Sequence, residues 1–367
     1  MKNAVLQIMN YAALYRGNFM ESLTALDKRL KEKDTVTIYL FCKDAENTAK
    51  TWIDDMIRAG DIVRFLNDNH KADVRLIKNL IREYNVKLIH THFLTMPQFL
   101  SIYCANRRSN LPIVMHMHNH SKKAGNIIKR KISQFIYRKC YMVACSKSVY
   151  DSLIRDYPKN KKCYIDNGVY FERLEKFETL DKRDFGVSED EKLLLIFGFD
   201  FYRKGVDLAI KAVSDLRKAG LKYSLLVSLS TNFEEAESNV KKILGEVPDW
   251  IKLIKARSDV ASFYNAVDMF LSPSREEGLP YSVIEAEYSR CNVVLSNISA
   301  QIHLKLKYGV WFKKDDPEDL KNAILKAEKL REEKLNNMDS VKEFMRENYS
   351  LSKWVDEVVE LYGSILS

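Results

Sequence analysis

The sequence has no Cys-x-x-Cys pair, and its six cysteines are scattered along the chain. This pattern argues against a zinc site and against a disulfide framework, and it is typical of proteins of a reducing cytosol. No apolar run approaches the roughly 20 residues that a membrane-spanning helix needs. The amino-terminal stretch loses its apolar character at Gln7 and Asn10, which indicates a buried first strand rather than a signal peptide.

Low-complexity segments and internal repeats are also missing from the 367 residues, of which 46% are hydrophobic and 30% charged. Such a chain is long enough for about two domains, each with its own core. The formal net charge of +9 favours acidic partners: nucleic acid, anionic lipid or a diphosphate ligand. The charge alone does not choose among them.

Short apolar runs alternate with helical patterns along the chain. The first half predicts strands at 5–9, 36–41, 61–65, 86–93, 112–118 and 141–146, with helices such as 19–33 and 72–84 between them. The second half predicts strands at 192–199, 223–230, 250–256, 268–274, 292–297 and 309–313. Continuous apolar strands joined by amphipathic helices indicate parallel βα units with helices on both faces of a sheet.

The alternation loosens after Tyr164, where a turn-rich, charged stretch predicts a domain boundary. A long helix is expected from Pro317 to about Asn348, and a last amphipathic helix at 351–366. The sequence thus predicts two doubly wound domains, with ligands at the carboxyl ends of the strands.

The stretch from Ser274 to Glu287 reads SREEGLPYSVIEAE and places Glu277 and Glu285 on either side of a Gly-Leu-Pro turn. Pro280 is expected at the first position of a helix, where its missing N–H costs nothing. The helix amino terminus would suit a phosphate or a sugar oxygen, and carboxylates accept hydrogen bonds from sugar hydroxyls. The alternative is two solvated acids at a helix start, where negative charge is favourable in any case.

The pattern S-x-x-E-G-x-P-x-x-x-x-E-A in this stretch resembles the Glu-x7-Glu signature of the retaining glycosyltransferases of family four. The resemblance extends over most of the chain. VDMFLSPS, FGFDFYRKGVDLAIKA, IDNGVYFERL and KWVDEVVELYGSIL are all similar to segments of that family.

The resemblance implies an α/β protein of the GT-B fold, in which two doubly wound Rossmann-like domains face a cleft. The expected domains are an acceptor-binding domain at 1–168 and a nucleotide-sugar-binding domain at 169–348. Residues 349–367 are expected to form a helix that crosses back to the first domain.

By the same resemblance, Glu277 holds the donor sugar together with Gly278, Leu279 and Pro280, and Glu285 contacts the nucleotide ribose. The three catalytic candidates are Glu277, Lys204 and His118. Lys204 would neutralise the donor diphosphate, and His118 would reach the donor sugar near the reacting carbon. Gly17, between the first strand and its helix, would approach the diphosphate and the acceptor.

The chain departs from the family at Phe199, where an arginine usually follows the glycine. We expect Arg203, next to Lys204, to supply the second positive charge, because a leaving diphosphate needs charge stabilisation. The alternative is a solvent-facing Arg203 at a helix start. Phe199 could also mark an altered donor site.

The histidines of PIVMHMHNH, His116, His118 and His120, alternate along a predicted strand and its end. They could suggest a metal, but no cysteine or carboxylate cluster joins them, and the family implies neither metal nor cofactor. We expect His116 and His120 to pack or to lie in solvent, and His90 and His92 to be structural.

Residues 122–139 combine apolar side chains at helical spacing with a run of lysines and arginines. Such a helix can lie on an anionic membrane surface. The alternative, which we prefer, is a core-facing helix with a wet basic face.

Taken together, these features predict a retaining, metal-independent glycosyltransferase that moves a sugar from a nucleotide-diphosphate donor to an acceptor hydroxyl. The acceptor is expected to be a lipid-linked or polysaccharide glycan precursor of a bacterial surface polysaccharide. The protein is expected in the cytoplasm, and a peripheral position on the inner face of the plasma membrane is the alternative. Alternatives are an epimerase or hydrolase of sugar nucleotides, which needs no acceptor, and a basic nucleic-acid-binding protein. Against the last, the charge is dispersed and no nucleic-acid motif is present.

Overall fold

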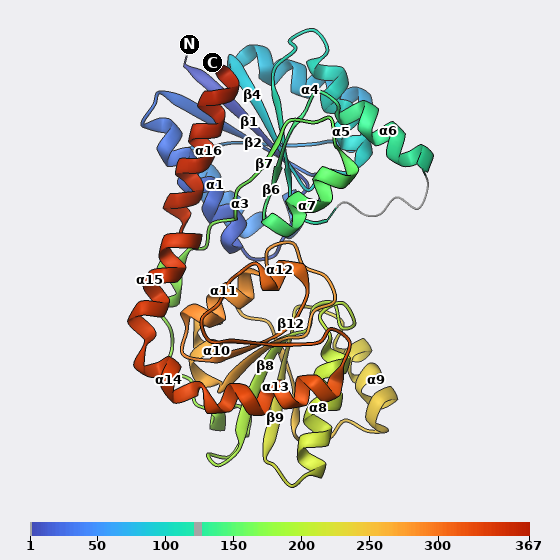
Figure 1. Cartoon of the computed structure of the whole chain (residues 1–367). Helices are drawn as coiled ribbons and strands as arrows, with labels where there is room; N and C mark the ends of the chain where they lie inside the picture. Colours follow the sequence, from blue (N-terminus) through green and yellow to red (C-terminus); the bar gives the residue numbers. More distant parts are fainter. Residues whose placement is uncertain (1, 121–126) are drawn as a thin grey trace. The chain divides into compact units, whose positions relative to one another are not determined.

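The contacts of the chain divide it into two compact units (Figure 1). The structure is a computed structural model that describes residues 2–120 and 127–367. Unit 1 contains the residues up to Gly168 together with Leu351–Ser367, and unit 2 is Val169–Ser350. Each unit is built on one parallel sheet with helices packed on it. The α/β class expected from the alternating pattern is therefore confirmed.

Unit 1 has a seven-stranded sheet in the order β3-β2-β1-β4-β5-β6-β7. Its strands are β1 Asn3–Met9, β2 Thr35–Phe41, β3 Ile62–Phe65, β4 Val86–His92, β5 Ile113–Met117, β6 Tyr141–Ala144 and β7 Lys162–Tyr164. The sequence reading did not find β7, whose three residues are only partly buried or exposed. The strand order reverses at β1 and β4, and ligands of such sheets bind beside the carboxyl ends of the strands at that point.

The helices of unit 1 are α1 Gly17–Lys31, α2 Ala45–Thr48, α3 Lys50–Arg58, α4 His70–Glu83, α5 Met96–Asn106, α6 Ile127–Tyr137, α7 Lys147–Asp156 and α16 Leu351–Leu366. The last of these returns to unit 1 and lies along α1 (Figure 1). It buries Val358 and Tyr362 in the same core as Leu23 of α1. An apolar stripe on one face of α16 thus holds the end of the chain on the first sheet.

Unit 2 has a six-stranded sheet in the order β10-β9-β8-β11-β12-β13. Its strands are β8 Lys192–Phe197, β9 Tyr223–Leu229, β10 Ile251–Lys255, β11 Met269–Ser272, β12 Asn292–Ser296 and β13 Gly309–Phe312. All seven residues of β9 are buried, as expected for a strand covered on both faces. Here the order reverses at β8 and β11, so the carboxyl ends of these two strands mark the expected ligand site of unit 2.

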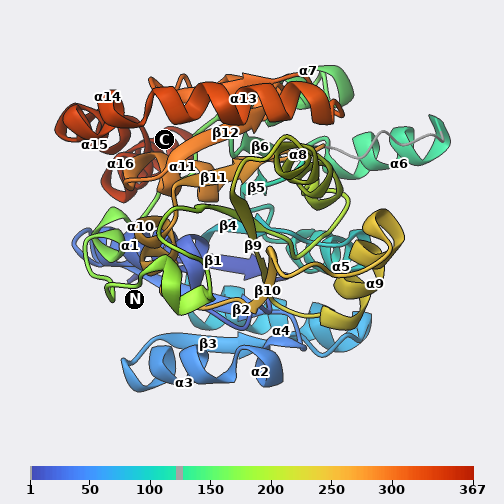
Figure 2. The same ribbon diagram turned by 90° about the horizontal axis from the view of Figure 1, so that it is seen from below.

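The helices of unit 2 follow the same alternation. Two short 3-10 helices, η1 Phe171–Leu174 and η2 Lys182–Phe185, precede α8 Val206–Lys218, α9 Phe233–Leu244, α10 Val260–Ala266, α11 Tyr281–Tyr288, α12 Ser299–Ile302, α13 Pro317–Lys329, α14 Arg331–Asn336 and α15 Met338–Tyr349. Figure 2 shows α8 between α13 and α9, and both neighbours contact it. Their apolar faces cover one side of the sheet.

The prediction of one helix from Pro317 to about Asn348 was wrong, because the structure has three helices there. The breaks fall at Leu330, with ψ −6°, and at Asn337, with φ −117° and ψ 19°. The Asn337 side chain donates to the carbonyl of Glu333 at 2.8 Å. Such side-chain-to-backbone bonds compete with helix geometry, and helical spacing of apolar residues does not reveal them.

The first break helps to place Lys334 of α14 in the core of unit 2. Its Nζ lies 2.9 Å from Oε2 of Glu287 in α11, and both side chains are fully buried. Lys334 also donates to the Cys291 carbonyl at 2.7 Å, and the Tyr308 N–H donates to Glu287 at 3.2 Å. Every charged group of this ion pair therefore has a hydrogen-bond partner.

Replacing Lys334 alone with methionine is expected to lower the free energy of unfolding of unit 2 by about 3–5 kcal/mol, because Glu287 becomes an unpaired buried charge. The double variant Lys334→Met/Glu287→Leu is expected to recover most of this loss, since replacing a whole buried pair with apolar groups is often neutral. Urea denaturation of the wild type, both single variants and the double variant measures the coupling. A loss in the double variant equal to the sum of the two single losses would show that the charges do not interact.

Candidate functional site

Lys204 and Glu277 meet where the strand order of unit 2 reverses. Lys204 lies in the loop after β8, and Glu277 lies in the loop after the neighbouring strand β11. The Lys204 Nζ is 2.6 Å from Oε1 of Glu277, and the Ser274 hydroxyl donates to the same oxygen at 2.7 Å. Both charged side chains are about nine-tenths buried, at 11% and 9% exposed. The structure thus brings together two predicted site residues that are far apart in the sequence.

Gly205 explains how the two loops come this close. Its φ is +73°, and a Cβ there would lie 2.1 Å from the backbone oxygen of Pro273. Only glycine fits both the left-handed conformation and the close approach. A further backbone bond, from the Arg275 N–H to the Arg203 carbonyl at 2.8 Å, ties the loops together.

Buried polar side chains hold the backbone at the end of β11 and in the loop after it by hydrogen bonds. The Ser296 hydroxyl donates to the Ser274 carbonyl at 2.5 Å. The Gln301 amide donates to the carbonyl and to the hydroxyl of Ser272 at 3.1 and 2.5 Å. These bonds fix the backbone that carries Glu277, which favours a preorganised binding site.

Arg203 and Phe199 complete this cluster. The Arg203 guanidinium lies 3.8 Å from Oε2 of Glu277, bonds to Asp200 at 2.8 Å and donates to the Glu276 carbonyl at 3.2 Å. Its hydrogen bond also lowers the pKa of Asp200. The Phe199 ring lies 5.1 Å from this guanidinium and 4.7 Å from the Lys204 Nζ. Two cations, two carboxylates and one aromatic ring therefore lie together at the switch point.

Glu285, predicted to meet a ribose, lies on α11 with protein partners of its own. It forms a partly buried ion pair with Arg173 of η1, and Tyr264 donates a hydrogen bond to its Oε2 at 3.1 Å. Burial raises the pKa of Tyr264 well above its usual value, so this phenol stays a donor. A ribose hydroxyl would have to share the carboxylate with Arg173.

The turn between the two glutamates differs slightly from expectation. Pro280 precedes α11 instead of opening it, and its carbonyl accepts the Val283 N–H at 3.0 Å. Leu279 is buried and Gly278 connects it to Glu277. The predicted order of carboxylate, glycine and helix start is therefore present, but the helix begins at Tyr281, one residue later than expected.

Gly17 and His118, the other predicted site residues, belong to unit 1. Gly17 has φ +43° and begins α1, directly after the loop that leaves β1. His118 lies just beyond β5, where its ring stacks on Phe93 with the centroids 4.1 Å apart. Its ring nitrogens approach His92 at 3.1 Å and Asn167 at 3.4 Å. Both positions lie near the switch point of the first sheet, beside β1 and β4.

Comparisons with known proteins agree with this geometry. The family model described as glycosyl transferases group 1 matches residues 177–342, and the model described as glycosyltransferase family 4 matches residues 23–173. The chain belongs to the group 1 glycosyltransferases. The match of the first model contains the loops that carry Lys204 and Glu277.

Two curated relatives of this glycosyltransferase are named for lipid-containing glycans. It is 26% identical to the lipopolysaccharide glucosyltransferase WaaG of Escherichia coli over 134 residues, 36% of each chain. It is 23% identical to the alpha-galactosylglucosyldiacylglycerol synthase of Streptococcus pneumoniae over 280 residues, 72% of this chain and 74% of the relative.

Solved structures show the same fold. A glycosyltransferase from Rickettsia africae matches with a TM-score of 0.82 and 18% identity, covering 100% of this chain and 99% of that one. Anabaena HepE in complex with UDP-glucose matches with a TM-score of 0.78 and 14% identity, covering 98% and 99%. The glycosyltransferase therefore has the GT-B fold expected from its sequence.

Sequence reasoning missed two arginines that organise the site of the glycosyltransferase. Arg173 forms an ion pair with Glu285, 112 positions away in the sequence. No pattern in either segment predicts this pair. Arg275, inside the quoted motif, makes a two-pronged bond to Asp207 at 2.8 and 2.9 Å and another to Asp315. The available signal was the position of Arg275 between Ser274 and Glu277 of that motif, because planar guanidinium groups favour such paired contacts.

Four histidines gather on one face of the first sheet. His90 and His92 come from β4, and His116 from the neighbouring β5, with one ring nitrogen of each within 4.8 Å of the others. His92 already bonds Gln7 at 3.0 Å and His118 at 3.1 Å, so an ion could bind only if these contacts broke. Burial keeps the pKa of all four rings, His118 included, well below the usual value, at about 3 for His116. The expected packing of His116 is confirmed.

The basic helix predicted at 122–139 corresponds to α6, and its residues 122–126 lie outside the described part. The core-facing alternative that we preferred is wrong for three apolar side chains of α6. Ile128, Ile132 and Phe135 are 67%, 50% and 63% exposed. Their spacing places them on one side of the helix. Among residues 2–120 and 127–367, every helix is too short or too polar to cross a bilayer.

Proposed function

We propose that this glycosyltransferase is a retaining enzyme that transfers a sugar from a nucleotide-diphosphate sugar to an acceptor hydroxyl. The observation that carries the proposal is the buried contact of Lys204 with Glu277 at 2.6 Å, at the switch point of unit 2. A cation held there can stabilise the leaving diphosphate, while the carboxylate orients sugar hydroxyls. The complex of HepE with UDP-glucose supports a nucleotide-sugar donor.

The contacts of Glu277 favour orientation over nucleophilic attack. Its Oε1 already accepts hydrogen bonds from Lys204 and Ser274, which weakens it as a nucleophile. Retention then follows from a front-face path, in which the departing diphosphate takes the proton of the acceptor hydroxyl. Lys204 and Arg203 stabilise the developing charge by position, without a covalent intermediate.

The acceptor that we propose is a lipid-linked or polysaccharide glycan precursor of a bacterial surface polysaccharide. The named products of WaaG and of the Streptococcus pneumoniae synthase support this class. An epimerase or hydrolase of sugar nucleotides remains the competing function, since it uses the same donor without an acceptor.

A thermal-shift series tests the donor. We expect a UDP-, GDP- or ADP-sugar at 100 times its Kd to stabilise the protein by about 2.7 kcal/mol. The matched nucleoside is expected to shift the melting temperature less, because it lacks the diphosphate that Lys204 contacts. The proposal fails if no nucleotide sugar shifts the melting temperature. Donor turnover by the purified protein alone would favour the epimerase or hydrolase.

The exposed face of α6 also fits a peripheral position on an anionic membrane. Ile128, Ile132 and Phe135 are flanked by exposed basic side chains, and Arg138 lies 3.9 Å above the Phe135 ring. Apolar side chains can enter the headgroup region, while each nearby cation adds about 1 kcal/mol of attraction to anionic lipid.

Vesicle flotation at low salt tests this position. We expect the wild type to float with vesicles that contain about 30% phosphatidylglycerol, because this anionic lipid gives the vesicle a negative surface charge. The double variant Ile132→Ser/Phe135→Ser is expected to bind at least about tenfold more weakly, since it loses two apolar side chains. Ile154→Ser, which changes an exposed isoleucine of α7, is the control. Equal flotation of all three proteins would contradict the proposal.

A further inference from the structure

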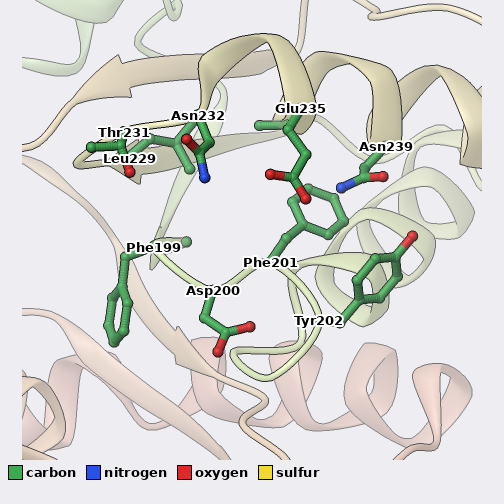
Figure 3. A pocket seen from close by; sticks show the side chains of 11 residues that line it. Phe199, Asp200, Phe201, Tyr202, Leu229, Thr231, Asn232, Glu235 and Asn239 are labelled. Atoms are coloured by element: carbon green, nitrogen blue, oxygen red, sulfur yellow. The ribbon is translucent and has the colours of Figure 1, made fainter.

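A cavity of about 210 Å³ opens in unit 2 beside the carboxyl ends of β8 and β9. One wall is the loop after β8, which contributes Phe199, Asp200 and Tyr202. The opposite wall is the first part of α9 and the turn before it, with Thr231, Asn232, Glu235 and Asn239 (Figure 3). Polar side chains of α9 thus line one side of a space that matches a small ligand, and the loop after β8 lines the other side.

Asn239 gives this cavity a polar group without a protein partner. Its side chain is 3% exposed, and its amide nitrogen has no hydrogen-bond partner among the described residues. Leaving such a donor unsatisfied costs about 1–3 kcal/mol. Figure 3 shows the amide of Asn239 and the carboxylate of Glu235 extending from the same helix beside the Phe201 ring. An oxygen bound in the cavity would satisfy the amide.

The chemistry of these two groups selects a hydroxyl. The Asn239 amide nitrogen needs an acceptor, whereas the Glu235 carboxylate needs a donor. A hydroxyl serves both groups at once. A phosphate would be repelled by Glu235, and a cation would face the donor side of the Asn239 amide.

Aromatic rings form the rest of the wall. Phe199 and Tyr202 are 55% and 52% exposed, although both side chains are large. Tyr202 meets Phe201 edge to face, with the centroids 5.3 Å apart. A pyranose ring has an apolar C–H face and an edge of hydroxyls, so it can cover an aromatic side chain while its edge meets polar groups. Pockets that combine apolar walls with a few placed polar groups are typical ligand sites.

The cavity adjoins the contact of Lys204 and Glu277 but is separate from it. Phe199 lines the cavity and contacts the Lys204 Nζ at 4.7 Å with its ring. Arg203 bonds Asp200 on the cavity side and the Glu276 carbonyl on the other. A ligand in the cavity would therefore lie next to the donor sugar, across Phe199.

We propose that this cavity binds a pyranose ring of the acceptor glycan, with one hydroxyl held between Glu235 and Asn239 and the ring face against the aromatic wall. The choice of the acceptor as the source rests on the proposed function, and it adds a sugar contact in unit 2 to the acceptor binding that the family resemblance implies for residues 1–168. The proposal also gives Phe199 a role: where related enzymes place a phosphate-binding arginine, this chain places an aromatic wall of a sugar site.

Saturation-transfer NMR on the full chain tests the site with the methyl glycosides of glucose, galactose and N-acetylglucosamine as probes. We expect at least one glycoside to receive saturation from the wild type. Asn239→Leu and Glu235→Gln are expected to weaken its binding at least tenfold. Glu234→Gln, on the neighbouring exposed position of α9, is expected to bind like the wild type. Asn239→Leu is expected to melt no lower than the wild type, because no hydrogen bond of its amide nitrogen is lost.

A second arm identifies the source of the sugar. Lys204→Gln is expected to bind the glycoside like the wild type but to lose the thermal shift with nucleotide sugars. If glycoside binding disappears in Lys204→Gln and survives in Asn239→Leu, the sugar lies in the donor site and the proposal is overturned. Absence of saturation transfer to all three glycosides overturns it as well. A normal nucleotide-sugar shift in that experiment would leave the proposed function intact.

Discussion

Replacing Lys204 with glutamine is expected to lower the rate of sugar transfer by about a thousandfold. The Lys204 Nζ is a nearly buried cation, 2.6 Å from Glu277. Fixed charges in such water-poor sites contribute about 3–4 kcal/mol to transition-state stabilisation when they face developing charge. Glutamine keeps a hydrogen-bond donor for Glu277, so the loss reports on the charge. The decrease should appear in kcat and kcat/KM alike, because the leaving diphosphate is most negative in the transition state.

Two further variants sharpen this experiment. Lys211→Gln removes an exposed lysine of α8 and is expected to retain wild-type turnover. Arg203→Gln is expected to lower turnover about tenfold, less than Lys204→Gln, because the more exposed guanidinium is screened by solvent. Turnover of Lys204→Gln within threefold of the wild type would refute the assigned role. An unchanged Arg203→Gln would refute the idea that Arg203 replaces the arginine missing at Phe199.

Acid is expected to unfold unit 1 at a pH where unit 2 is still folded. His90, His92, His116 and His118 are kept neutral by burial, and their pKa values lie well below 6.5. In the unfolded chain they take up protons near pH 6.5, so the unfolded state binds more protons and the free energy of unfolding falls as the pH falls. Each ring contributes about 1.4 kcal/mol at one pH unit below 6.5. Four rings give a loss of about 5–6 kcal/mol at pH 5.5.

Asp166 acts in the opposite direction, but more weakly. Burial raises its pKa to about 6, so its folded state binds more protons than its unfolded state between about pH 4 and 6. Lowering the pH through this window therefore adds stability, about 0.8 kcal/mol between pH 7.5 and 5.5. The histidines outweigh this gain several-fold.

Tryptophan fluorescence in urea at pH 7.5 and 5.5 measures the two units separately. Trp52 and Trp354 lie in unit 1, and Trp250 and Trp311 lie in unit 2. A protein with both tryptophans of unit 2 changed to phenylalanine reports on unit 1, and the reverse pair reports on unit 2. Equal stability of unit 1 at both pH values, or an equal loss in both units, would contradict the prediction.

His116→Phe tests the cluster directly. Both ring nitrogens of His116 are buried without a hydrogen-bond partner among the described residues, so removing them is expected to raise stability at pH 7.5 by about 1–3 kcal/mol. The same change should reduce the acid-induced loss by about a quarter, because one of four rings is removed. A structural need for the imidazole would instead lower stability at both pH values.

The sequence predicted the two parallel sheets because each buried strand is a continuous apolar run, such as the one at β9. It also predicted the approach of Lys204 and Glu277, through the resemblance to a known signature. The division of the charged stretch after Pro317 into three helices was harder to predict. The spacing of its apolar residues indicates one helix, whereas the break at Asn337 depends on one side-chain hydrogen bond. Strand β7 is too short and too exposed to leave a pattern.

Contacts between distant segments were beyond the reach of the sequence. The pair of Arg173 with Glu285 and the buried pair of Lys334 with Glu287 join positions 112 and 47 residues apart. A charged residue in a helical pattern is normally solvated, so Lys334 gave no sign of its burial. The pocket beside Phe199 likewise depends on how two loops and one helix meet in space.

Unit 1 is assembled from both ends of the chain, and this has a consequence for its synthesis. A ribosome releases residues up to Gly168 long before α16, whose Val358 and Tyr362 complete the core around Leu23. Unit 2 is continuous and can fold as soon as Ser350 has emerged, since domains generally fold as units. The nascent first sheet must therefore wait with an uncovered apolar face, a natural substrate for chaperones. A chain that stops at Ser350 is expected to aggregate although unit 2 is complete.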